Sequence, residues 1–216
     1  IPVQKAPEFL EERTWQLSRQ TLRFPRPDSS TMPAYVMGIL NATPDSFSDG
    51  GQFDTLDRAI THAQSMLQDG VSILDIGGES SRPGADPVAA SVEIARVVPI
   101  IKAVRACSDV LISIDTVKAD VAEAALGAGA DIVNDISAGR NDKRMFEVVR
   151  GNQAGMVLMH MKGRPKTMQE GDLTTESIVN DVLNFFDSRI NCALSNGLSE
   201  SQIALDPGLG FGKTFE

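Results

Sequence analysis

Short apolar segments recur along this chain of 216 residues, and each ends in a side chain that can bind a polar ligand. These side chains are amides, acids or an imidazole: Asn41, Asp75, Asp115, Asn134, His160 and Asp206. A carboxylate accepts hydrogen bonds, and an asparagine amide both donates and accepts them. Gathered around one cavity, such groups would recognise the hydrogen-bonding edge of a polar ligand.

The elements between these residues predict how they are brought together. Each of the apolar segments is followed by a helix pattern, as in residues 57–67, 88–106 and 175–195. Nearly continuous apolar strands that alternate with helices indicate a parallel sheet covered on both faces, which is either open and doubly wound or closed into a (β/α)8 barrel. Polar residues at six strand ends favour the barrel, because a barrel gathers many strand ends on one face whereas an open sheet concentrates its site at a switch point.

Two parts of the chain differ in pattern. Residues 33–216 carry the repeat and are predicted to form an α/β domain of the (β/α)8 barrel class. Residues 1–32 are predicted to be an N-terminal extension or linker, with a helix over residues 8–19 and a Pro/Ser-rich segment over residues 24–33. A complete barrel has eight βα units and ~250 residues. About six units are recognisable here, so we expect the last two to be missing from this chain.

Composition excludes several classes of protein. The formal net charge is −9, from 20 Lys and Arg against 29 Asp and Glu, and no basic cluster marks a nucleic-acid surface. No apolar run approaches the ~18 residues of a membrane span. Cys107 and Cys192 lie in helix patterns without metal-type spacing, so both are expected to be reduced and partly buried. A cytoplasmic location is expected, or an organelle matrix in a eukaryote.

The loops between the elements carry longer motifs. MGILNATPDSFSDGG (residues 37–51) and DIGGESSRPGA (residues 75–85) follow the first two strands, and SIDT, NDISAG, LMHMKGRPKTMQ and LDPGLGFGK follow in order. These segments resemble the signatures of dihydropteroate synthases, from about Tyr35 to Lys213. The resemblance implies a pterin-binding barrel that joins 6-hydroxymethyl-7,8-dihydropterin pyrophosphate to p-aminobenzoate, giving 7,8-dihydropteroate and pyrophosphate. It also implies a homodimer at full length, and the Pro-rich lead-in is compatible with a fusion to another enzyme of folate synthesis.

The same resemblance assigns a pterin pocket. Asp115, Asn134 and Asp206 would bind the donors and acceptors of the pterin edge, with Met159 and Phe211 as apolar walls. The carboxylates suit this role because they accept two hydrogen bonds at once. Each acid also has a structural alternative, since Asp115 precedes a helix and could cap it, and Asp206 precedes a proline turn.

Mg2+ and pyrophosphate are the other ligands that the resemblance implies. Asn41 would help to hold both, because Mg2+ prefers oxygen ligands, although an asparagine can also simply cap its strand. Asp75 would orient pocket groups or contact the pterin through water, or would be a structural hydrogen-bonded acid. His160 invites a general-base role, but a hydrogen-bonded residue on the pocket floor is the favoured interpretation.

The first two loops would complete the active site. By resemblance, Phe47 and Pro83 flank the aminobenzoate ring, and Ser81 and Arg82 contact the anionic reactants. Asp49 would stabilise positive charge at the pterin methylene. Phe47, Asp49 and Arg82 are therefore the predicted catalytic residues, in an SN1-like transfer that must be shielded from water.

Two motifs of the family do not occur in this sequence. They are a Ser-Arg-Lys segment of the seventh strand and an Arg-x-His of the eighth, so residues 1–216 alone are expected to be inactive. Lys213 is not the lysine of the former motif and is expected at the pocket rim. Two alternatives stay open: a pterin-binding methyltransferase, which would lack the TPDSFSDGG and SSRPGA loops, and a noncatalytic module of a fused folate-pathway protein.

Overall fold

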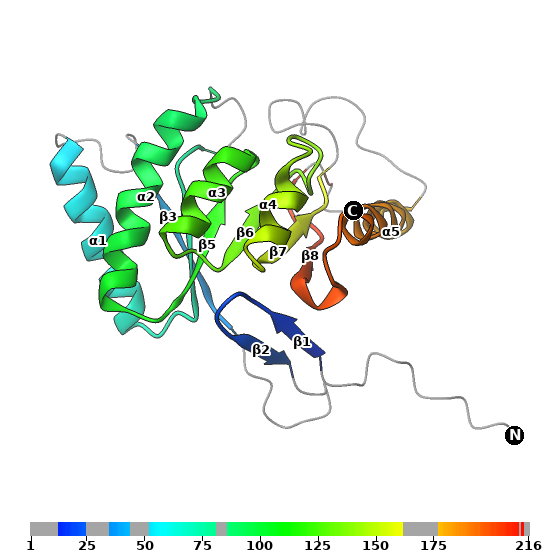
Figure 1. Ribbon diagram of the computed structural model, residues 1–216, viewed down its shortest axis with the longest axis horizontal. Helices are drawn as coiled ribbons and strands as arrows, with labels where there is room; N and C mark the ends of the chain where they lie inside the picture. The colour runs from blue at the N-terminus through cyan, green and yellow to red at the C-terminus, as the bar shows by residue number, and fades with distance from the viewer. Residues whose placement is uncertain are drawn as a thin grey trace, which may run out of the picture.

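Parallel strands and helices alternate along most of the chain in the computed structural model, which describes residues 13–24, 35–43, 52–80, 86–161, 177–211 and 213 (Figure 1). A hairpin of β1 (Arg13–Gln16) and β2 (Thr21–Phe24) comes first. The following elements are β3 (Met37–Asn41), α1 (Gln52–Gln68), β4 (Ile73–Gly77), α2 (Ala90–Cys107), β5 (Leu111–Asp115), α3 (Ala119–Ala128), β6 (Ile132–Asp135), α4 (Met145–Gly151), β7 (Gly155–Met159), α5 (Ile178–Ser195), η3 (Glu200–Gln202) and β8 (Ile203–Asp206). The six strands and five helices expected after residue 33 are confirmed, with small shifts at their ends.

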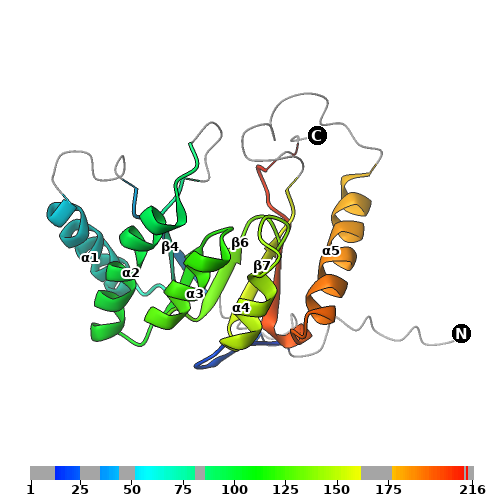
Figure 2. The ribbon, with the colours of Figure 1, turned by 45° about the horizontal axis from the view of Figure 1, so that its top comes forward.

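The six strands form one parallel sheet in chain order, β3-β4-β5-β6-β7-β8. An open doubly wound sheet reverses its order at a switch point, and no reversal occurs in the described part of this sheet. The helices α1 to α4 lie in a row along one side of the strands (Figure 2). The fold is therefore α/β, with six consecutive strands of a (β/α)8 barrel, as predicted.

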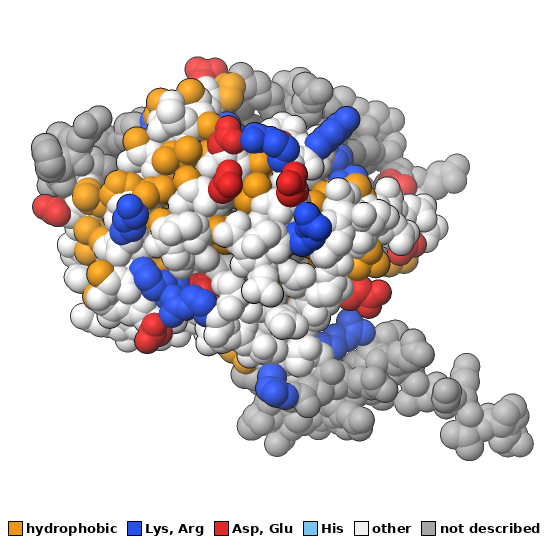
Figure 3. All heavy atoms as spheres, viewed as in Figure 1, with side chains coloured by type: hydrophobic (Ala, Val, Ile, Leu, Met, Phe, Trp, Pro, Cys, Tyr) orange, Lys and Arg blue, Asp and Glu red, His pale blue; other side chains and the backbone are white. Residues whose placement is uncertain are grey.

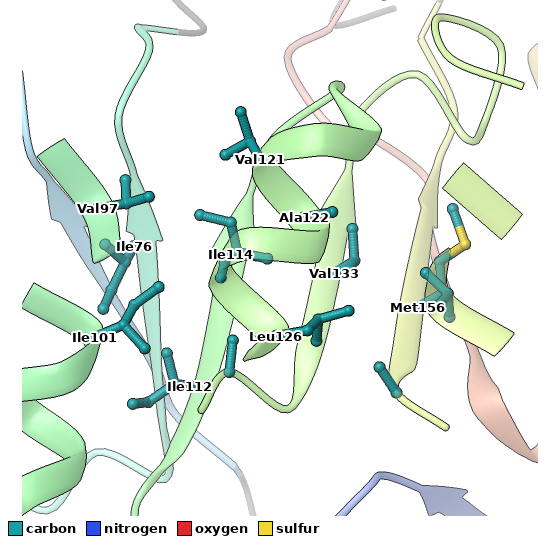
Figure 4. Close-up of a cluster of buried hydrophobic side chains, with 14 of the residues drawn as sticks. Ile76, Val97, Ile101, Ile112, Ile114, Val121, Ala122, Leu126, Val133 and Met156 are labelled. Atoms are coloured by element: carbon teal, nitrogen blue, oxygen red, sulfur yellow. The ribbon is translucent and has the colours of Figure 1, made fainter. Parts of the chain in front are cut away.

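The outer face of the sheet is an apolar layer that packs against the helices. Alternate residues of the strands point to this face because side chains alternate along a strand. In Figure 4 the strand residues Ile76, Ile112, Ile114 and Val133 face Val97 and Ile101 of α2 and Val121, Ala122 and Leu126 of α3, and Met156 of β7 belongs to the same cluster. Burial of each large side chain stabilises the fold by ~1.5–3 kcal/mol, so this layer fixes the strand register.

The hairpin covers the inner face of the sheet at the strands' amino-terminal ends. Trp15, Leu17 and Leu22 form a hydrophobic cluster with four strand residues, Ile73, Leu111, Ile132 and Val157. The Trp15 indole nitrogen also donates to the carbonyl of Gln202, over 2.9 Å. This end of the barrel interior is therefore filled by apolar side chains, which leaves the other end for polar groups.

The prediction of a helix over residues 8–19 is wrong, because residues 13–16 form a strand. Trp15 and Leu17 are buried while their neighbours are exposed, which is the two-residue period of a strand. Packing of Trp15 and Leu17 against the sheet favours this two-residue period. The described part of the expected extension or linker is thus packed against the barrel.

Other expectations concern the surface. Cys107 is exposed rather than partly buried, and Cys192 is partly buried; both are free thiols. Acidic and basic side chains are interspersed on the face shown in Figure 3. Among the described residues no helix is long and apolar enough to cross a membrane.

Candidate active site

The polar side chains at the strand ends share the inner face of the sheet. Asn41 pairs with Gly77, Gly77 with Asp115, and Asp115 with Asn134. Residues paired across parallel strands point to the same face. A Cβ atom at Gly77 would lie 3.5 Å from Asp115 Oδ2, so the Asp115 carboxylate extends over Gly77. The predicted positions of these residues at the carboxyl ends of their strands are confirmed, whereas their roles stay predictions.

Asp115 presents to the barrel interior a carboxylate that accepts no hydrogen bond from the described residues. It does not cap α3, whose N-cap is Lys118, so the alternative role as a helix cap is wrong. Among the described residues no donor forms a hydrogen bond with its carboxylate. Burial, reinforced by the negative charge of Asp75 and Glu93, raises the pKa of Asp115 well above its usual value. A ligand that brings N–H donors would stabilise the ionised form.

Asp75 lies deeper on the same face and is bonded to Asn134. The Asn134 Nδ2 atom donates to Asp75 Oδ2 over 3.1 Å. Asp75 Oδ1 and the neighbouring Ser113 Oγ are buried and meet no partner in good hydrogen-bond geometry. Burial raises the pKa of Asp75, and the side chains of Ser113 and Asn134 offset only part of that effect. Asp75 therefore fixes the amide of Asn134 while retaining an unused acceptor.

Asp206 lies at the end of β8 and pairs with Met159. Val157, two residues before Met159, pairs with Asn134, so Asp206 and Asn134 point to the same face. Asp206 Oδ1 accepts from the Gly208 amide over 2.7 Å. The alternative role in a turn is thus confirmed for one oxygen, and the other oxygen has no protein donor in the described part of the chain.

An apolar wall joins the ends of four strands. Met159, Met161 and Ile136 form a buried cluster against which Val117 and Phe211 pack. These residues follow β5, β6, β7 and β8 closely in the sequence. The contact that brings Met159 and Phe211 into one cluster agrees with the predicted apolar walls. A flat ring could stack there, with Asp115, Asn134 and Asp206 at its edge.

His160 lies beside this apolar cluster and not with Asp115, Asn134 and Asp206. Its Nδ1 atom is buried without a hydrogen-bond partner among the described residues, so the expected hydrogen bond is not formed there. The ring makes an edge contact with Phe185, with centroids 4.9 Å apart. Burial, together with the charges of Lys213 and Arg140, lowers the pKa of His160. These effects favour the neutral imidazole of His160.

Metal-binding groups are sparse. Among the described residues no group of three His, Cys, Asp or Glu side chains can hold a metal. Asn41 is exposed at the rim of the sheet and offers one amide oxygen. A single protein oxygen suits a Mg2+ ion that keeps waters and substrate phosphate oxygens as its other ligands. Phe47, Asp49, Ser81, Arg82 and Pro83 lie outside the described residues.

A buried ion cluster next to the site was missed. Lys118 Nζ bridges Glu79 Oε2 and Glu93 Oε2, each at 2.5 Å, and Glu93 is fully buried. Burial opposes ionisation of the lysine, but the two carboxylates raise the pKa of Lys118 on balance. A signal was present, because Glu93 is in phase with the buried Val97 and Ile101 of α2. An acid inside an apolar helix stripe indicates a buried partner.

Comparison with known proteins agrees with this geometry. The sequence profile described as "Pterin binding enzyme" matches residues 37–216. The chain belongs to the pterin binding enzyme family.

This pterin binding enzyme is 48% identical over 186 residues to the dihydropteroate synthase of Synechocystis, an alignment that covers 84% of our chain and 63% of that protein. It superposes with a TM-score of 0.77 on a dihydropteroate synthase from Clostridium difficile solved in the presence of pteroic acid, at 46% identity, covering 84% of this chain and 66% of that one. The TM-score is 0.80 with the Xanthomonas albilineans enzyme solved with 4-aminobenzoic acid, at 37% identity and coverages of 94% and 69%. The chain thus spans 63% of the length of the Synechocystis relative.

Proposed function

We propose that this pterin binding enzyme acts as a dihydropteroate synthase. It would condense 6-hydroxymethyl-7,8-dihydropterin pyrophosphate with p-aminobenzoate to give 7,8-dihydropteroate and pyrophosphate. The observation that carries the proposal is the inner face on which Asp115, Asn134 and Asp206 lie next to the cluster of Met159 and Phe211. The relatives named above, solved with pteroic acid or 4-aminobenzoic acid, support the same choice of ligands.

Pterin recognition would use groups that lack protein partners. The Asp115 carboxylate accepts from two ring donors at once. Asn134 is held by Asp75 and offers its amide oxygen, while the unpaired oxygen of Asp206 accepts from a further donor. Because ligand donors stabilise the ionised form of Asp115, we expect pterin binding to release a proton at pH values where the carboxyl of the free protein is still protonated.

The reaction would proceed by an SN1-like substitution. The bond between the pterin methylene carbon and the pyrophosphate oxygen breaks, and its electron pair leaves with pyrophosphate. The cation that remains is attacked by the lone pair of the aminobenzoate nitrogen, which then loses a proton to water. The nearby carboxylates favour positive charge on the pterin, and the apolar wall limits the access of water.

Mg2+ would neutralise charge on the departing pyrophosphate, with Asn41 as its ligand from the described part of the protein. By resemblance, Ser81 and Arg82 would contact the anionic reactants, and Phe47 and Pro83 would flank the aminobenzoate. Asp49 would face the developing positive charge. A homodimer and a fusion to another enzyme of folate synthesis also stay predictions.

Calorimetry with pteroic acid tests the proposed pocket. Wild-type protein should bind pteroic acid, and Asp115→Asn should weaken binding at least tenfold, because an amide replaces the double acceptor and such a charged hydrogen bond contributes about 1.5–3 kcal/mol. Asp109→Asn is the matched control, since Asp109 is fully open to solvent. Equal affinity in both variants would contradict the assignment of Asp115.

Calorimetry also distinguishes the proposed synthase from the two alternative functions. A synthase should bind both pteroic acid and 4-aminobenzoic acid. Binding of methyltetrahydrofolate in preference to pteroic acid would favour the methyltransferase. Tight binding of pteroic acid without any binding of 4-aminobenzoic acid would favour a noncatalytic pterin module.

A further inference from the structure

The ammonium group of Lys213 meets three backbone carbonyls. Lys213 Nζ donates to the carbonyl oxygens of Gly208 over 2.8 Å, of His160 over 3.2 Å and of Phe211 over 3.3 Å. A lysine has three N–H donors and no acceptor, so all of its hydrogen bonds are used within the protein. None of the ion pairs among the described residues involves Lys213.

The three carbonyls belong to two neighbouring segments of the candidate pterin pocket. His160 follows Met159 at the end of β7, while Gly208 and Phe211 lie in the loop that follows Asp206 at the end of β8. The two segments are in close contact, since a Cβ atom on Gly208 would clash with the carbonyl oxygen of His160. Lys213 therefore joins the loop that carries one predicted wall to the strand that carries the other.

Hydrogen bonds within the loop extend this connection to Asp206. The Gly208 amide donates to Asp206 Oδ1 over 2.7 Å, and the Phe211 amide donates to the carbonyl of Gly208 over 3.0 Å. The orientation of the Asp206 carboxylate thus depends on the position of Gly208. Lys213 holds that position by binding the carbonyl of the same residue.

We propose that Lys213 is a positioning residue that sets the geometry of the pterin-binding end of the barrel by fastening the loop after β8 to the end of β7. The proposal rests on the proposed pterin-binding function. It differs from the role of a direct ligand, which would need a free N–H donor on Lys213. Burial lowers the pKa of Lys213, and the negative charge of Asp206 offsets only part of this effect.

Hydrogen exchange tests the fastening without any ligand. In Lys213→Met, which keeps the length of the side chain but has no donors, the amides of Gly208 and Phe211 should exchange at least tenfold faster. The amide of His160, which donates to the Asp206 carbonyl over 2.8 Å, should change less because it continues the ladder between β7 and β8. Lys143→Met is the matched control, since Lys143 is exposed. Unchanged exchange at Gly208 and Phe211 would overturn the proposal.

Pteroic acid affinity tests the consequence for the pocket. Lys213→Met should bind pteroic acid about tenfold more weakly than wild type, which corresponds to the loss of hydrogen bonds to a charged group. Lys213→Arg should not restore affinity, because a planar guanidinium directs its donors differently. Full restoration by arginine would instead show that charge alone matters and would overturn the proposal. If wild-type protein does not bind pteroic acid, the proposed function fails, while the exchange experiment still decides the role of Lys213.

Discussion

Asn134 and Asp75 form a hydrogen bond of 3.1 Å even though strand β5 lies between their own strands, β6 and β4. Such a bond passes over an intervening strand on the inner face of the sheet. The bond fixes the orientation of the Asn134 amide through its nitrogen. The amide oxygen stays available to accept a hydrogen bond. The bond therefore determines how Asn134 can meet a ligand.

Replacement of this amide by an acid should make stability depend on pH. Asn134→Asp places two carboxylates in contact, so one of them keeps its proton and its pKa rises strongly. A raised pKa in the folded state favours folding at low pH, and this contribution is lost as the pH rises through that pKa. We expect the free energy of unfolding to be about 2 kcal/mol below wild type at pH 8, with a smaller gap at pH 5.

Urea unfolding at both pH values measures this gap. Asn152→Asp is the control, because Asn152 is exposed and its amide also donates one hydrogen bond, to the Val148 carbonyl over 2.9 Å. Its gap should stay within about 0.5 kcal/mol. A gap that is the same at pH 5 and pH 8 in Asn134→Asp would be evidence against the contact.

The Asp115 carboxylate should lower the stability of the folded protein at neutral pH. Its pKa is raised by burial and by neighbouring acids, so the ionised form is unfavourable in the folded protein. Asp115→Asn should stabilise the protein at pH 7, because the uncharged amide avoids the cost of burying an ionised carboxylate beside other acids. As the pH falls, the wild-type carboxyl takes up a proton at its raised pKa and the difference should vanish towards pH 4. Thermal unfolding across this range checks the sign, and a less stable variant at pH 7 would contradict it.

Lys118 should be important for folding because it neutralises a buried acid. Lys118→Met leaves Glu93 buried without a cation, and loss of one partner of a buried pair costs about 3–5 kcal/mol. Lys102→Met, at an exposed position of α2, should change stability by no more than about 0.5 kcal/mol. Chemical denaturation measures both. Adding Glu93→Gln to Lys118→Met should recover part of the loss, and strict additivity would argue against the pair.

Gly208 and Gly210 provide a matched pair for the close approach of the last loop to β7. Both have positive φ, of 65° and 87°, so alanine is strained at either position. Only at Gly208 would the added carbon meet a backbone atom, the His160 carbonyl oxygen, whereas nothing lies within 4 Å at Gly210. We expect Gly210→Ala to cost about 1 kcal/mol and Gly208→Ala clearly more, with weaker pteroic acid binding. Equal effects would show that the loop can move away without loss.

The hairpin should contribute to the stability of the barrel. Leu17→Ala removes a buried side chain and should cost about 2–4 kcal/mol. Gly155→Ala should also destabilise, because its new carbon would clash with Leu17. The double variant should be more stable than the sum of the single effects predicts, since the smaller side chain leaves room. Additive effects in urea unfolding would mean that these residues do not touch.

The sheet and most of the polar positions could be predicted because both follow from local periodicity. Apolar segments of strand length identified β3 to β8, and the polar residue at each end marked Asp115, Asn134 and Asp206. The hairpin was missed although Trp15 and Leu17 have the two-residue spacing of a strand, because a strand of four residues gives too short a pattern to decide against a helix. Packing of Trp15 and Leu17 against the sheet decides in favour of the strand.

Contacts between side chains that are far apart in the sequence also could not be predicted from local patterns. The bridge from Lys118 to Glu79 and Glu93 depends on how two loops and a helix pack, which spacing does not encode. The same holds for Lys213, whose three partners lie up to 53 positions away. Its sequence context suggested a place at the pocket rim, but not that its donors are already occupied.

The alternation along strand β5 separates two kinds of evolutionary change. Ile112 and Ile114 face the helices, whereas Ser113 and Asp115 face the interior of the barrel. Neighbouring positions of this strand thus face different physical constraints. A substitution at Ser113 or Asp115 would change the lining of the barrel interior, whereas a substitution at Ile112 or Ile114 would change the packing of the sheet against the helices.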